Sequence, residues 1–88
     1  MRVLIAEDDR RVAGLLKNRL KSDHISADVC YDGQEALELS GVVHYDVIVL
    51  DIMMPKMDGL EAVRRMRERG TDTPVLFLTA RDAIEDRV

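Results

Sequence analysis

The sequence of 88 residues lacks several features that would point to particular classes of protein. Cys30 is its only cysteine, so no internal disulfide can form and no cysteine-rich metal cluster is encoded. No apolar run approaches the length that crosses a bilayer, and the apolar start is too short for a signal peptide. We therefore expect a cytoplasmic protein that has no contact with membranes.

The chain also lacks an excess of basic residues and the common nucleotide-binding loops. Its formal net charge is -4, which gives no electrostatic footprint for nucleic acid. Neither a G-x-x-x-x-G-K-[ST] loop nor a G-x-G-x-x-G loop is present, so the nucleotide-binding folds that depend on them are not supported. The arginines between Arg64 and Arg69 are interleaved with acids at helical spacing, which is typical of a solvated helix face.

Apolar runs and amphipathic stretches alternate along the chain. Short apolar runs predict strands over residues 3–6, 46–50 and 75–78, and a weak alternation of apolar residues predicts another over residues 26–31. Helical spacing predicts helices over residues 10–22, 34–40 and 60–69, with Asp32 as a cap and Gly70 as a stop, and residues 80–88 look like the opening of another helix. The expected inward-facing stripes are Val12, Leu15, Leu16 and Leu20 in the first helix and Leu60, Val63 and Met66 in the third.

This alternation predicts a single α/β domain over residues 1–88. Crossovers of this length give parallel strands, and right-handed crossovers place helices on both faces of an open sheet. All strands then present their carboxyl ends at one edge, where Glu7, Asp8, Asp51 and Thr79 each follow a predicted strand. The chain is small for a domain, so hydrophobic burial alone makes it only marginally stable.

Residues 47–59 are the stretch around which the chain is organised. An apolar, β-branched run ends on Asp51, and the chain then turns through Pro55 and Asp58-Gly59 into a helix. Two interpretations of Asp51 are open from this pattern. Its carboxylate caps the following turn, or it faces the crevice where open α/β sheets bind ligands.

Three carboxylates at one sheet edge repel one another unless a proton or a cation neutralises them. Magnesium suits an all-oxygen site, with Asp8 and Asp51 as ligands and Glu7 binding directly or through water. Such a site suits phosphoryl transfer to Asp51 as a nucleophile, with the hydroxyl of Thr79 donating to a phosphoryl oxygen. Each assignment has an alternative. Glu7, Asp8 and Asp9 are a simple cluster of acids at a helix N-terminus, where the helix dipole favours negative charge, and Thr79 begins a helix capping box.

Three segments closely resemble the response-regulator receiver domain of two-component signalling: residues 5–9 (IAEDD), 50–59 (LDIMMPKMDG) and 76–80 (LFLTA). The resemblance runs from the first residue to the last. It implies the flavodoxin-like parallel sheet of strand order 2-1-3-4-5, of which this chain supplies 2-1-3-4 and lacks the fifth strand and the fifth helix. That order makes the first and third strands neighbours.

The resemblance also implies a role for each site residue. Asp51 accepts a phosphoryl group from a phosphohistidine of a sensor histidine kinase. Asp8 and Asp51 bind magnesium with the backbone carbonyl of Met53, and Glu7 stands where many members have a first acidic residue. Thr79, with the backbone of Ala80, contacts the phosphoryl group and switches the output. Such a domain is a phosphoacceptor and not an enzyme beyond its own phosphorylation and dephosphorylation.

The last ten residues resemble receivers that precede a winged-helix DNA-binding domain, so a transcriptional regulator is the expected parent and DNA binding belongs to a domain outside this chain. The fifth-strand lysine and aromatic residue of receivers are missing, and Lys56 does not match that lysine. We expect an uncovered fourth strand to drive dimers or higher oligomers. The alternatives are a dimerisation module without phosphotransfer and a small magnesium-dependent phosphatase, which Met53 disfavours because such phosphatases have a second aspartate there.

Overall fold

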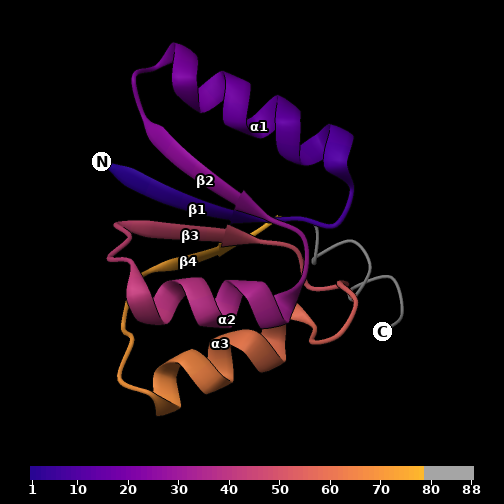
Figure 1. The fold of residues 1–88 in the computed structure, drawn as a ribbon, viewed down its shortest axis with the longest axis vertical. Helices are drawn as coiled ribbons and strands as arrows, with labels where there is room; N and C mark the ends of the chain where they lie inside the picture. The colour runs from indigo at the N-terminus through magenta and orange to yellow at the C-terminus, as the bar shows by residue number, and fades with distance from the viewer. Residues whose placement is uncertain (79–88) are drawn as a thin grey trace.

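The computed structural model describes residues 1–78 as a parallel β-sheet with helices on both faces (Figure 1). Along the chain the elements are β1 (Arg2–Ala6), α1 (Arg10–Ser22), β2 (Ser26–Cys30), α2 (Gly33–Val42), β3 (Val47–Leu50), α3 (Gly59–Glu68) and β4 (Val75–Phe77). The predicted α/β fold is confirmed. The helix expected over residues 80–88 lies outside the described residues.

The sheet has the strand order β2-β1-β3-β4, and all of its neighbouring strands are parallel. Ile5 of β1 pairs with Val29 of β2 on one side and with Val49 of β3 on the other, and Val49 pairs in turn with Leu76 of β4. The predicted order 2-1-3-4 is therefore confirmed. Because β1 and β3 are neighbours, the residues that follow them meet at the carboxyl edge of the sheet.

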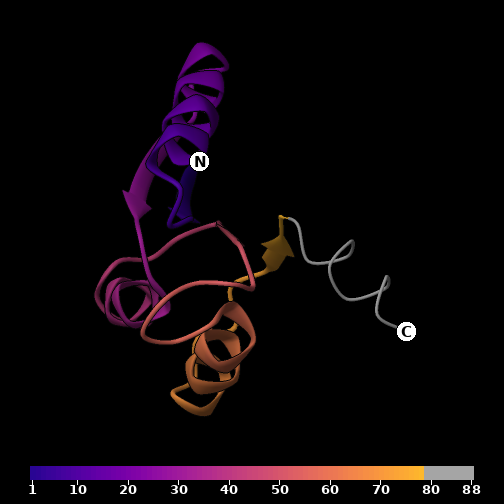
Figure 2. The same ribbon diagram turned by 90° about the vertical axis from the view of Figure 1, so that its right-hand side faces the viewer.

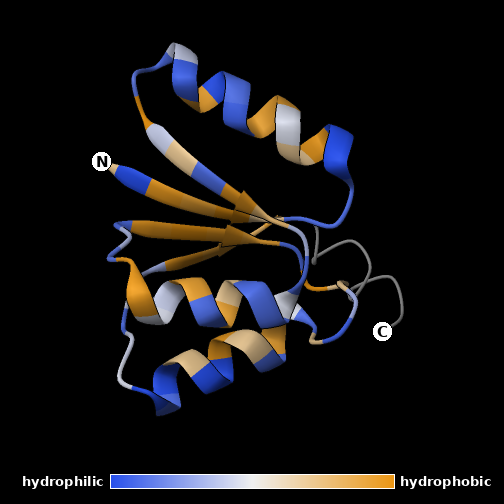
Figure 3. Cartoon of the chain, viewed as in Figure 1, coloured by the Kyte–Doolittle hydropathy of each residue, from blue (hydrophilic) through white to orange (hydrophobic). Residues whose placement is uncertain are grey.

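Alternation along the strands divides the buried residues between two faces. Leu4 and Ala6 join Ile48 and Leu50 in one core, which α2 and α3 complete with Ala36, Leu37, Ala62 and Met66. Val3 and Ile5 are equally buried and alternate to the opposite face, where α1 contacts β1 and β2. Figure 2 shows α2 and α3 side by side and apart from α1, and Figure 3 shows the central strands β1 and β3 as largely hydrophobic.

Each of the three described helices begins at an aspartate that accepts backbone hydrogen bonds. Asp9 accepts from the N–H groups of the first turn of α1 at 3.0 and 3.2 Å. Asp32 and Asp58 cap α2 and α3 in the same way, each at 2.8 Å. Gly70 follows α3 with a φ of 89°, a backbone conformation in which glycine is favoured. The predicted cap at Asp32 and stop at Gly70 are confirmed.

The predicted inward-facing stripes are wrong at two residues. Leu60 is 52% exposed and Leu15 is 64% exposed. In α3 the buried positions are Gly59, Ala62 and Met66, because α2 and α3 lie against each other and small side chains permit that approach. None of the helices among residues 1–78 combines the length and the apolar character needed to span a bilayer.

Candidate functional site

The structure brings together three carboxylates from two separate parts of the chain. Glu7 and Asp8 follow β1, and Asp51 follows β3, where its N–H donates to the carbonyl of Ala6 at 3.1 Å. One carboxylate oxygen from each of the three acids lies within 4.8 Å of the others. Adjacent parallel strands thus place at one point acids that lie more than 40 residues apart in the sequence.

Glu7 is the most deeply buried of these acids, with 4% of its surface exposed. Its carboxylate accepts a hydrogen bond from the N–H of Asp9 at 2.9 Å. The pKa of Glu7 is raised to about 7, chiefly by burial and also by the nearby charge of Asp51, although that backbone hydrogen bond acts to lower it. A cation placed between the acids would favour the ionised form of Glu7.

The donor set fits a hard divalent cation. Asp8 is exposed and Asp51 is partly buried, so the cluster lies at the surface with Glu7 as its floor. Magnesium binds oxygen at about 2.0–2.1 Å, which places oxygens on opposite sides of the ion roughly 4 Å apart. The separation of at most 4.8 Å between the carboxylate oxygens is close to that value. The three acids can therefore hold such an ion after small side-chain movements.

The loop between β3 and α3, residues 51–58, is held closely at its end. A Cβ atom at position 59 would lie 2.3 Å from the carbonyl oxygen of Asp51, so only glycine fits there. The N–H of Gly59 also donates to the carbonyl of Ile52 at 2.7 Å. Met53 lies early in this loop with 70% of its surface exposed. Its carbonyl as a ligand stays a prediction, and Thr79 and Ala80 lie outside the described residues.

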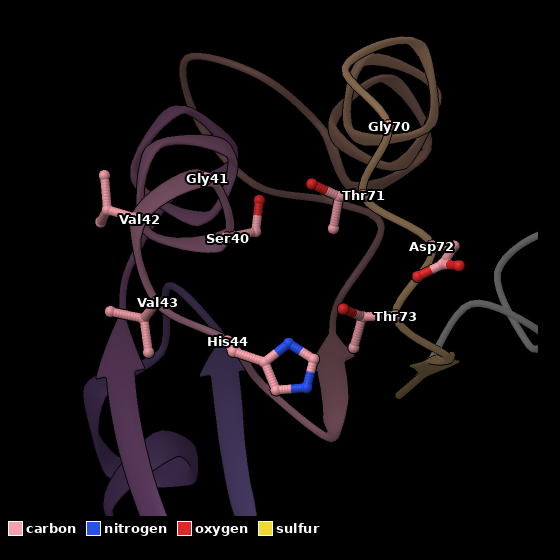
Figure 4. A pocket seen from close by; sticks show the side chains of 9 residues that line it. All are labelled: Ser40, Gly41, Val42, Val43, His44, Gly70, Thr71, Asp72 and Thr73. Atoms are coloured by element: carbon pink, nitrogen blue, oxygen red, sulfur yellow. The ribbon is translucent and has the colours of Figure 1, made fainter.

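A separate cavity of about 360 Å³ opens at the opposite, amino edge of the sheet. Figure 4 shows Ser40 and His44 on one side of it and Thr71 and Thr73 on the other. The hydroxyl of Ser40 donates to the carbonyl of Leu37 at 2.9 Å. Within residues 1–78, the acids at the carboxyl edge are the one group of three side chains suited to a metal, so that edge is the stronger candidate.

Residues 3–88 match the family model described as the response regulator receiver domain. The chain belongs to the receiver domain family. It is similar over its whole length to the response regulator MprA of Mycobacterium avium, at 44% identity over 88 residues, and it spans 39% of the length of that relative. The resemblance found in the sequence is thereby confirmed.

Two solved receiver structures show the same fold. The receiver domain of the sensor histidine kinase PA1611 from Pseudomonas aeruginosa, solved with a magnesium ion in its active-site cleft, matches with a TM-score of 0.89 at 27% identity. That match covers 98% of this chain and 72% of the other. The response regulator TrrA of Thermotoga maritima matches at 30% identity with a TM-score of 0.81, over 91% of this chain and 71% of that one, and a chain of the complex between TrrA and the histidine kinase ThkA matches at 34% identity with a TM-score of 0.81, over 90% of this chain and 68% of that one.

Proposed function

We propose that this receiver domain is a phosphoacceptor in which Asp51 takes a phosphoryl group from a phosphohistidine of a sensor histidine kinase. The observation that supports the proposal most strongly is the cluster of Glu7, Asp8 and Asp51 at the carboxyl edge of neighbouring strands. A receiver relative solved with magnesium in its cleft and another solved with a histidine kinase add support.

In the proposed reaction, a carboxylate oxygen of Asp51 forms a bond to phosphorus while the phosphorus–nitrogen bond of the phosphohistidine breaks. The electron pair of that bond stays on the imidazole nitrogen. Asp8, Asp51 and the carbonyl of Met53 would hold a magnesium ion, which would supply positive charge beside the transferring group. Glu7 would bind the ion directly or through water. Burial raises the pKa of Glu7 to about 7 in the metal-free protein, so a cation bound between the acids would favour release of its proton.

The output of the domain is proposed in the same way. The hydroxyl of Thr79 and the backbone of Ala80 contact the phosphoryl group and pass the signal on. The full-length protein is a cytoplasmic transcriptional regulator whose DNA-binding domain lies outside the 88 residues, which span 39% of the matched relative. Transcriptional control by that parent follows phosphorylation of Asp51.

A second candidate function is association with another chain. Among residues 1–78, β4 is hydrogen-bonded to β3 alone, and Leu76 and Phe77 on it are 61% and 38% exposed. Strand edges with exposed apolar side chains favour pairing with a further strand. We infer that the 88-residue chain forms dimers or higher oligomers. Sedimentation that shows a folded, strictly monomeric species at high concentration would refute this inference.

The test of the phosphoacceptor proposal is the intact mass of the protein after incubation with a small acyl-phosphate donor. We expect the mass of one phosphoryl group to be added in the presence of magnesium and not after chelation. Asp51→Asn abolishes the addition. Asp72→Asn, which changes an exposed aspartate at the opposite edge of the sheet, is the matched control and leaves it intact. Addition that is equal in Asp51→Asn would contradict the proposal.

A further inference from the structure

The start of α2 touches the loop that carries the proposed phosphoacceptor. In Figures 1 and 2 the first turn of α2 lies beside the chain that follows β3. Gly33 is the first residue of α2 and is buried. A Cβ atom at this position would lie 1.9 Å from the carbonyl oxygen of Met57 and 2.7 Å from its carbonyl carbon. Both neighbours are backbone atoms, so a larger residue would force the loop away from the helix.

A second contact joins the same two segments. The side chain of Asp32 is only 11% exposed, and its two oxygens have different partners. One oxygen accepts the N–H of Glu35 at 2.8 Å and so begins α2. The other oxygen lies 3.7 Å from the Nζ of Lys56 in the β3–α3 loop. One carboxylate thus caps the helix and pairs with the loop.

The backbone of Lys56 in this loop has an energetically unfavourable conformation. Its φ is 69°, in the left-handed region that residues other than glycine, asparagine and aspartate rarely adopt. Such a conformation persists where the surroundings fix it. The surroundings here are the ion pair with Asp32 and the contact between Met57 and Gly33 on the adjacent residue.

We propose that the Asp32-Gly33 turn clamps the β3–α3 loop and thereby places Asp51 and the carbonyl of Met53 for metal binding. Asp32 and Gly33 are positioning residues, because they act on the site through the loop. Gly59, which directly follows the loop, packs against the carbonyl of Asp51 and so joins this end of the loop to its start. The inference rests on the proposed function, since it assigns these residues to the same magnesium-dependent site.

The experiment compares Gly33→Ala with Gly41→Ala in the 88-residue chain. Gly41 lies in the same helix, and a Cβ atom there would meet nothing within 4 Å, so this variant is a matched control. Two quantities are measured under conditions where circular dichroism shows each protein to be folded. Amide hydrogen exchange at Gly59 reports the order of the loop, and calorimetric titration with magnesium alone reports metal affinity.

We expect Gly33→Ala to speed exchange at Gly59 and to weaken magnesium affinity about tenfold or more, as changes to residues that support metal ligands commonly do. Gly41→Ala leaves both unchanged. Asp32→Asn keeps a good capping residue but removes the charge, and we expect it to weaken magnesium affinity about two- to threefold. It serves as the test if Gly33→Ala does not fold.

The outcomes separate the two proposals. A wild-type chain that binds no magnesium overturns the proposed function and the positioning role with it. A wild-type chain that binds magnesium, together with folded Gly33→Ala or Asp32→Asn variants of unchanged affinity, overturns the positioning role alone. Faster exchange at Gly59 without any change in affinity would also overturn it, because the clamp would then be merely structural.

Discussion

Replacing Asp51 by asparagine should make the metal-free protein more stable, although it removes the proposed phosphoacceptor. The three acids of the cluster lie with their oxygens within 4.8 Å of one another, and Glu7 is buried. Such an arrangement is unfavourable without a cation, because like charges repel and burial disfavours the charged form. Asparagine keeps the size and the hydrogen-bonding oxygen of the side chain while removing one charge from the cluster.

The size of the effect follows from Coulomb's law. Two unit charges 4.8 Å apart repel by about 1 kcal/mol at the dielectric constant of water and by about 2 kcal/mol at an effective value of roughly 40. Asp51 faces Asp8, which is exposed, and Glu7, whose pKa of about 7 leaves it partly protonated at neutral pH. We therefore expect Asp51→Asn to raise the free energy of unfolding by about 1–2 kcal/mol in the presence of a chelator.

Urea unfolding followed by circular dichroism, with chelator and with magnesium, measures this effect. Magnesium at about ten times its dissociation constant should stabilise the wild type by about 1.4 kcal/mol and Asp51→Asn by much less. Asp72→Asn, at the opposite edge of the sheet, should have the stability of the wild type with chelator and should be stabilised by magnesium as much as the wild type is. A lower stability of Asp51→Asn than of the wild type without metal, or equal stabilisation of both proteins by magnesium, would show that the three acids do not repel one another or do not bind the ion.

Three further predictions concern the rest of the described fold. The hydroxyl of Tyr45 donates to Asp28 at 2.7 Å, and this hydrogen bond lowers the pKa of Asp28. Tyr45→Phe should therefore lower the free energy of unfolding by about 1 kcal/mol at pH values above the ordinary pKa of aspartate. Below that pKa the variant should lose less stability with falling pH than the wild type does, which urea unfolding at several pH values measures. Cys30 is 2% exposed and burial raises the pKa of its thiol to about 12, so a thiol reagent should react with it only after unfolding; rapid reaction in the native state would contradict this. In the same assay Met66→Ala should lower the free energy of unfolding by about 2–5 kcal/mol and Leu60→Ala by less than about 0.5 kcal/mol. Equal losses would mean that Leu60 faces the core, as the sequence predicted.

Much of the fold could be predicted because its signals are local. Apolar runs marked the strands, and the capping aspartate Asp32 and the stop at Gly70 could be identified by residue type alone. The strand order came from the resemblance to receivers, since nothing local specifies which strands become neighbours. The exposed Leu60 shows the limit of a hydrophobic stripe, because the approach of α2 to α3 selects the small residue Ala62 for the buried position.

The residues of the candidate site could be predicted from the sequence, but their burial and the backbone contacts around them could not. The sequence pattern placed Glu7, Asp8 and Asp51 at one edge of the sheet, the resemblance to receivers made their strands neighbours, and the structure brings the three acids together. The sequence could not show that Glu7 is the buried member, because Glu7, Asp8 and Asp9 are adjacent and equally acidic in the sequence. Nor could it show the contact of Gly33 with Met57, since a close approach of two backbones leaves no pattern beyond the presence of a glycine. Thr79 and Ala80 stay predictions.

The most direct test of the central claim is to identify the residue that carries the phosphoryl group. The protein is incubated with a small acyl phosphate and magnesium, reduced with borohydride and digested, and its peptides are sequenced by tandem mass spectrometry. Reduction of an aspartyl phosphate yields homoserine, and we expect homoserine in place of Asp51 and at no other aspartate. Homoserine at Asp8 or Asp9 instead, or a phosphoryl group on a side chain that is not an acid, would contradict it.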